Sequence, residues 1–125
     1  MEINDISGSI VDSALKVHSA LGPGLLESVY EACLAHEIET RGLAVRRQVC
    51  LPVRYGDTVV EAGLRLDLVV AESVVVEVKA IESFLPVHTA QLLTYLKLGR
   101  FPLGLLLNFN VLRMKEGVRR VVNGS

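Results

Sequence analysis

Three charged residues in the middle of the chain interrupt segments that otherwise have the composition of buried β-strands. Asp67 lies within Leu-Asp-Leu, and Glu77 and Lys79 lie within Val-Glu-Val-Lys. Side chains two residues apart in a strand share a face, so Glu77 and Lys79 are expected to point the same way. Because isolated charges are expensive to bury, charges in such a setting need a compensating partner.

The spacing between the two acids predicts a specific hairpin register. A three-residue loop after Val70 would set that residue opposite Val74. Asp67 would then face Glu77, with their Cβ atoms about 5 Å apart, a distance at which two carboxylates repel each other. A two-residue loop would instead set Asp67 opposite Val78, on the wrong face of the sheet.

A divalent cation is the natural compensation for two opposed carboxylates. Magnesium prefers hard oxygen ligands, typically one or two carboxylates, and leaves positions for water and substrate phosphate. Lys79, on the same face as Glu77, could contact a phosphate oxygen or an attacking water. The alternative is structural: ion pairs of the acids with Lys79 or Arg65 on an exposed sheet face would need no metal.

The first 42 residues predict two helices. Asn4 or Asp5 can cap the first helix, whose apolar residues recur at helical spacing. This helix is expected to end at the Gly-Pro-Gly breaker of residues 22–24. The second helix is expected from about Leu25 to Arg41, with Gly42 as its left-handed terminus.

The rest of the chain predicts a sheet with one further helix and no linker or repeat, so residues 1–125 form one expected domain. Gly63 marks a bulge or a close approach within a strand, and a terminal hairpin is expected to turn at Glu116-Gly117. The order is ααβββαβ with a β tail. The expected elements are strands at 45–55, 59–70, 74–80 and 103–108, a helix at 87–98 and a hairpin at 110–122.

Two of the helices carry further candidate residues. Glu27 and Tyr30 are three apart on the second helix, and Gln91 and Tyr95 are four apart on the third, so each pair shares a helical face. Glu27 could be a third acidic ligand, and Gln91 could bond the nucleophilic water or a phosphate. Each also has an ordinary interpretation, because an acid near a helix start is favoured by the helix dipole and tyrosines often pack half-buried.

The composition sets limits on the class of protein. Of 125 residues, 50% are hydrophobic and 22% are charged, which is typical of a globular domain. The net charge of -1 argues against extended, non-specific wrapping of nucleic acid, although it allows a local basic cleft. Cys33 and Cys50 lack metal-binding spacing and are expected to be free, buried thiols of a cytoplasmic protein. No apolar run approaches the ~20 residues needed to cross a membrane.

Taken together, these residues resemble the small bacterial GxxExxY proteins, a branch of the PD-(D/E)xK nuclease superfamily. Gly24, Glu27 and Tyr30 stand at the positions that give this branch its name. Gln91 and Tyr95 match the QxxxY element of the exonuclease-like branch.

The two strands carry the rest of the resemblance. Asp67 matches the acidic residue of the superfamily's second core strand, and Glu77 and Lys79 match its (D/E)xK element on the third. Leu66 stands where many members have proline. The resemblance extends from about residue 17 to residue 122, and the elements in this order are more specific than (D/E)xK alone.

The resemblance implies an α/β fold with a restriction-endonuclease-like αβββαβ core. A mixed central sheet flanked by helices would carry an extra N-terminal helix and a C-terminal β tail. It also implies hydrolysis of nucleic-acid phosphodiesters with Mg²⁺, for which Mn²⁺ could substitute. The implied metal site consists of Asp67, Glu77, Val78 and Glu27. The implied catalytic residues are Asp67, Glu77, Lys79 and Gln91. The implied substrate-binding residues are Tyr95, Arg65 and Tyr30.

The expected partner is nucleic acid, DNA rather than RNA, without a membrane. Because the chain has little basic surface, a short or single-stranded substrate is expected, or a homodimer that pools basic residues. A non-catalytic module that binds nucleic acid or protein on the same fold is the alternative. An oligomeric structural protein, assembled through the terminal hairpin, is a third hypothesis.

Overall fold

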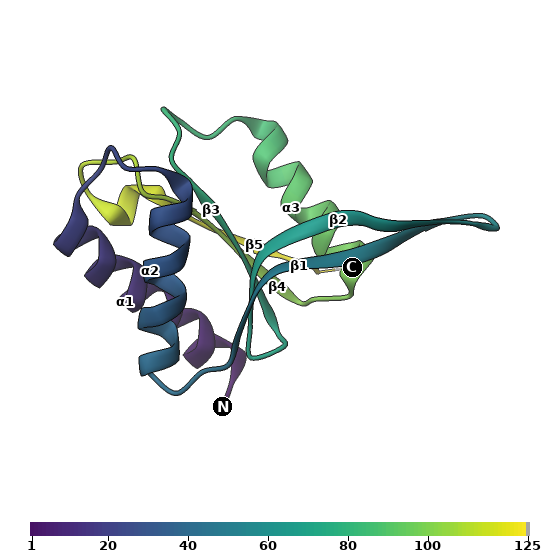
Figure 1. The fold of residues 1–125 in the computed structure, drawn as a ribbon, viewed down its shortest axis with the longest axis horizontal. Helices are drawn as coiled ribbons and strands as arrows, with labels where there is room; N and C mark the ends of the chain where they lie inside the picture. Colours follow the sequence, from purple (N-terminus) through teal and green to yellow (C-terminus); the bar gives the residue numbers. More distant parts are fainter. Residues whose placement is uncertain (125) are drawn as a thin grey trace.

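A five-stranded sheet in the order β1-β2-β3-β4-β5 forms the centre of the structure (Figure 1). The computed structural model describes residues 1–124. Strands β3 and β4 are parallel, whereas the other neighbours are antiparallel, so the sheet is mixed as predicted. The strands are Val45–Tyr55 (β1), Thr58–Val70 (β2), Val74–Lys79 (β3), Leu103–Asn108 (β4) and Val118–Val122 (β5).

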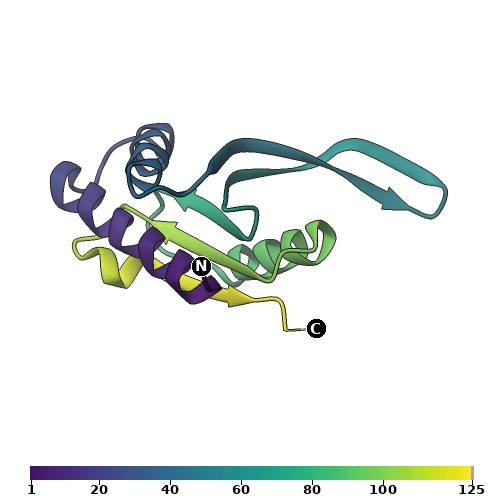
Figure 2. The same cartoon turned by 90° about the horizontal axis from the view of Figure 1, so that it is seen from below.

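Helices cover both faces of this sheet (Figures 1 and 2). The helices α1 (Ile3–Leu21) and α2 (Glu27–Thr40) pack on one face, and α3 (Pro86–Gly99) packs on the other. The chain from β3 through α3 to β4 forms the crossover that a parallel strand pair needs. This arrangement confirms the predicted fold class, including the extra N-terminal helix and the C-terminal strand.

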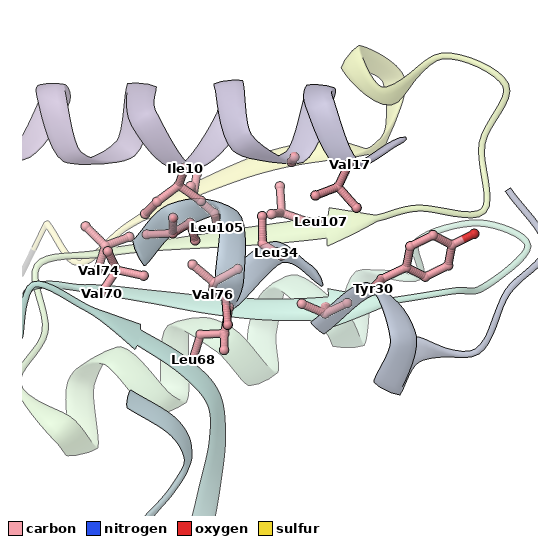
Figure 3. Close-up of a cluster of buried hydrophobic side chains, with 14 of the residues drawn as sticks. Ile10, Val17, Tyr30, Leu34, Leu68, Val70, Val74, Val76, Leu105 and Leu107 are labelled. Atoms are coloured by element: carbon pink, nitrogen blue, oxygen red, sulfur yellow. The ribbon is translucent and has the colours of Figure 1, made fainter. Parts of the chain in front are cut away.

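Alternating strand residues build two separate cores. Val76 and Leu105 face α1 and α2, where they meet Ile10 and Leu34 (Figure 3). Val75, next to Val76 in sequence, faces α3 on the other side. Strand β3 is therefore buried on both faces, which explains its continuous run of valines.

Two helix ends differ from the prediction. The first helix begins at Ile3, one residue after Glu2, whose N–H donates to the Asp5 carboxylate at 3.2 Å. Asp5 thus caps from inside the helix, and Asn4 is not the cap. The third helix ends at Gly99 rather than before it, and the capping residue is Arg100, which adopts a left-handed conformation with φ 60°.

The predicted terminal hairpin is wrong. Residues 110–113 are irregular, and a 3-10 helix follows them at Met114–Gly117. Strand β5 then pairs with the neighbouring strand β4 and not with residues 110–113. The cause is the open edge of β4, whose backbone groups would lack partners in a local hairpin. The buried side chain of Val121 also ties β5 to the core on the α3 side.

A long two-stranded arm, formed by the outer halves of β1 and β2, projects from the body (Figures 1 and 2). The pairing register shifts between Leu51 and Val53. At Gly63 an added Cβ would lie 2.6 Å from a methyl of Val53, so the predicted close approach is present. Tyr55 at the tip is 84% exposed.

The two cysteines are free, as expected, but only one is sheltered. Cys33 is partly buried, whereas Cys50 lies exposed on the arm, so the prediction of a buried thiol is wrong for Cys50. An alternating strand pattern does not reveal that a hairpin leaves the sheet. No helix among residues 1–124 is long and apolar enough to span a membrane.

Candidate active site

Strands β2 and β3 pair in the register that the sequence predicted. A three-residue loop joins them, and the next opposed positions beyond the paired residues are those of Asp67 and Glu77. Pairing stops there, at the start of the candidate site. The paired residues are Val70 with Val74, Val69 with Val75, and Leu68 with Val76.

The two carboxylates bridge the strands where the backbone ladder ends. The Asp67 N–H donates to Glu77 Oε2 at 2.8 Å, and the Val78 N–H donates to Asp67 Oδ2 at 2.8 Å. Each acid therefore uses one oxygen to hold the opposite strand. Within residues 1–124 the second oxygen of each carboxylate accepts no hydrogen bond, and both oxygens remain available as ligands.

The acid pair is electrostatically strained. Glu77 is only 5% exposed. Burial, and then the neighbouring charge of Asp67, raises the pKa of Glu77 from 4.5 to about 8, although Lys79 acts in the opposite direction. Glu77 is thus held largely protonated at neutral pH unless a further positive charge approaches. This is the condition under which a cation stabilises a carboxylate pair.

Lys79 and Glu27 both lie near the end of β3. Lys79 is the last residue of that strand, and its positive charge lowers the pKa of Glu77. The Ala80 N–H donates to Glu27 Oε2 at 3.3 Å, so the first residue of α2 lies beside the end of β3. Glu27 is exposed, and its carboxylate lies at the rim of the site.

Tyr30 does not line a cleft, contrary to the expectation of a substrate contact. Its side chain is fully buried, and its ring stacks on Phe109 with centroids 4.6 Å apart. The hydroxyl donates to the Gly22 carbonyl at 2.6 Å and accepts from the Leu25 N–H at 3.1 Å. Tyr30 therefore anchors the loop that precedes α2, and through that loop it places Glu27.

The third helix brings one of its two candidates to the acids. Burial, followed by the charges of Glu77 and Asp67, raises the pKa of Tyr95, so its hydroxyl lies within their field. Gln91 lies one turn earlier on α3, and its exposed side chain makes no hydrogen bond within residues 1–124. Arg65 is exposed on β2, two residues before Asp67.

Sequence reasoning missed Glu31. It lies one turn after Glu27 on α2, is 7% exposed, and accepts hydrogen bonds from Arg47 and Gln48. Its charge is the smallest of the causes that raise the pKa of Glu77, and its own hydrogen-bond partners lie on β1. The i, i+4 spacing of two acids on one helix was the available signal.

The comparisons with known proteins agree with this geometry. The model of the PD-(D/E)XK nuclease superfamily matches residues 4–121. The chain belongs to this superfamily. No similar curated protein and no similar solved structure was found. The sheet and its flanking helices are accordingly those of a restriction-endonuclease-like fold, with Asp67 on β2 and Glu77 and Lys79 on β3.

PD-(D/E)XK nucleases generally use divalent metals, and the acid pair has suitable chemistry. Asp67 and Glu77 supply two hard carboxylate donors, which is enough for an ion that retains several water ligands. The Val78 side chain is buried in the core, so only its main-chain carbonyl could join them. Within residues 1–124 no three His, Cys, Asp or Glu side chains are clustered for metal binding, so Glu27 stands apart from the pair.

Proposed function

We propose that this chain is a metal-dependent nuclease that hydrolyses phosphodiester bonds in nucleic acid, with Mg²⁺ as its ion and Mn²⁺ as a substitute. The observation that carries the proposal is the buried Glu77 beside Asp67, at the point where β2 and β3 stop pairing. Two carboxylates held side by side cost stability, and a divalent cation removes that cost.

The residues around the pair suit the individual tasks of hydrolysis. Asp67 and Glu77 would hold the ion, which supplies Lewis acidity and lowers the pKa of a bound water. Lys79, on the Glu77 face, would donate to a phosphate oxygen and orient the attacking water. Gln91 and Tyr95, from α3, would position the phosphate, and Glu27 would support the water ligands at the rim.

The substrate we propose is DNA, in short or single-stranded form, because the net charge of -1 offers little extended attraction to a long duplex. Arg65 would contact the backbone beside the site. A homodimer would double the basic residues available. We also propose that the chain belongs to the GxxExxY branch. Its proposed location is the cytoplasm, where Cys33 and Cys50 would remain reduced.

One observation favours a second candidate, a binding module that has lost catalysis. The two acids lie together without a third acidic or histidine ligand among residues 1–124. Such a module would bind nucleic acid without cutting it. Metal titration separates the two candidates, because a module without an ion should bind Mn²⁺ no better than its Asp67→Asn variant does.

A cleavage assay tests the first proposal. Labelled single-stranded and duplex DNA, and RNA, are incubated with the protein in Mg²⁺ or Mn²⁺, alongside Lys79→Ala. We expect metal-dependent products from the wild type and none above background from the variant, whose melting temperature should stay within a few degrees. Lack of cleavage of every substrate in either metal would end the enzymatic proposal.

A further inference from the structure

Glu31 is a buried acid to which the proposed chemistry gives no role. Its Oε1 accepts from Gln48 Nε2 at 2.6 Å, and its Oε2 accepts from Arg47 Nε at 3.2 Å and Nη2 at 3.1 Å. Both donors come from β1, whereas Glu31 comes from α2. The carboxylate is therefore a charge-assisted link between helix and strand.

The two donors are consecutive residues of one strand, which is unusual. Consecutive side chains in a regular strand point to opposite faces, so Arg47 and Gln48 should not reach the same carboxylate. They do so because Gln48 adopts a left-handed conformation, with φ 52°. That conformation is costly for a residue with a side chain, and it persists only where the surroundings enforce it. The bond to Glu31 is such an enforcing contact.

The turn at Gln48 coincides with the position of Asp67. Gln48 is missing from the β1–β2 pairing, although its neighbours on both sides keep one continuous register. Counting along that register, the residue opposite Gln48 is Asp67. The flanking pairs are Arg47 with Leu68 and Val49 with Leu66.

Both strands change faces at this position. Leu66 and Leu68 are two residues apart and should share a face, but Leu68 packs on the α1–α2 side and Leu66 on the α3 side. Val45 and Val49 of β1 should likewise share a face. Val45 nevertheless packs on the α1–α2 side and Val49 on the α3 side. Beyond this point the arm leaves the sheet (Figure 1). The residue at the crossing on β2 is Asp67.

We propose that Glu31 is a positioning residue: through Arg47 and Gln48 it fixes the turn in β1 opposite Asp67, and so holds the Asp67 carboxylate on the Val78 amide and the Asp67 amide on Glu77. This inference rests on the proposed function for its purpose. Its structural part concerns the metal-free protein and can be tested independently of catalysis.

The first test uses Glu31→Gln, with Glu72→Gln as the matched control. The control removes a carboxylate from the exposed salt bridge between Glu72 and Arg46. Arg46 is the residue before Arg47 on β1, so the control tests loss of a similar pair on the same strand. Hydrogen exchange is measured at the Asp67 and Val78 amides, which donate to the two site carboxylates. We expect protection at both amides to fall about tenfold or more in Glu31→Gln relative to other β2 and β3 amides, and to stay unchanged in the control.

Calorimetric titration with Mn²⁺ supplies the second readout. We expect Glu31→Gln to bind the same number of ions about tenfold more weakly, as is typical when a residue that orients ligands is lost. Loss of an ion from the stoichiometry would make Glu31 a ligand and overturn the positioning role. If wild type binds no Mn²⁺, the proposed function fails, while amide exchange still decides the inference.

Two variants of Gln48 cover the case in which Glu31→Gln does not fold. Gln48→Ala and Gln48→Gly both remove the donor, but glycine adopts the left-handed conformation without strain. We expect Gln48→Gly to keep more Asp67 amide protection than Gln48→Ala. Equal, wild-type protection in both variants would overturn the inference.

Discussion

The β2–β3 hairpin has two ends with opposite properties. At its closed end Val70 and Val74 are fully buried, paired through the backbone and surrounded by apolar side chains. At its open end Asp67 and Glu77 replace the ladder with side-chain bonds and repel each other. The contacts at the closed end stabilise the fold, whereas the repulsion at the open end destabilises it. This is the pattern expected of a functional site.

The largest effect should come from breaking the open end. Asp67→Asn keeps the size of the side chain but removes a negative charge from the site. We expect cleavage to fall roughly 10³-fold, comparable to the loss of a major electrostatic group in other enzymes. Measured kcat/KM and a melting curve check this together, because the fold should survive. A variant with more than a tenth of wild-type activity contradicts the assignment of Asp67 as a ligand.

The strain at the open end should also appear as a pH dependence of stability. The pKa of Glu77 is about 8 in the folded protein against 4.5 for an unperturbed glutamate, so between these values the folded state binds more protons than the unfolded state. Stability should therefore fall as pH rises from about 4.5 to 8, by at most about 1.4 kcal/mol per pH unit from this group.

Denaturation of metal-free protein across this pH range measures that slope. Glu77→Gln should flatten it, because the amide does not ionise, and saturating Mg²⁺ should restore stability to the wild type at pH 8 but not to the variant. A wild type whose stability is flat over the window, or is equally stabilised by Mg²⁺ in the variant, speaks against the strained pair.

Damage to the closed end should reverse the pattern. Val74→Ala removes two buried methyl groups and should lower the free energy of unfolding by about 2 kcal/mol. Activity at low temperature and the affinity for Mn²⁺ should remain near those of the wild type, because each acid lies three residues along its strand from the Val70–Val74 pair. Chemical denaturation and titration on the same sample provide the comparison. A loss of Mn²⁺ affinity would mean that the two ends are not separable.

The smallest effect should come from the loop that leads to the open end. Tyr30→Phe removes the hydroxyl bonds to Gly22 and Leu25 but keeps the ring on Phe109. We expect a loss of roughly 1 kcal/mol in stability. Activity should fall only a few-fold, through displacement of Glu27. A large loss of activity without loss of stability would instead indicate that Tyr30 contacts the substrate directly.

The hairpin register was predictable because strand chemistry is local. The run of valines and the three-residue loop are both readable from the sequence, and together they determine which residues are opposed. The pairings of β2 with β3 confirmed this interpretation. The resemblance to the PD-(D/E)xK superfamily rested on these strands and on residues of two helices, and the match over residues 4–121 confirmed that superfamily.

The remaining features depend on contacts between distant segments. Tyr30 matched a motif, yet its burial depends on Phe109, 79 positions later in the chain. Gln48 gives no local sign of its left-handed conformation, and the carboxylate that its side chain contacts, that of Glu31, comes from another element. The prediction of a terminal hairpin was wrong for the same reason. Strand β5 pairs with the open edge of β4, which lies earlier in the chain, and not with the residues just before it.

The most direct test of the account is a crystal soaked in Mn²⁺ and measured at a wavelength where manganese scatters anomalously. We expect an anomalous peak between Asp67 and Glu77, with oxygen distances of about 2.0–2.3 Å. The Glu77 carboxylate should contact the ion. Crystals that diffract well and show no peak, with both acids still bonded only to the opposite strands, would contradict the central claim that this pair is a metal site.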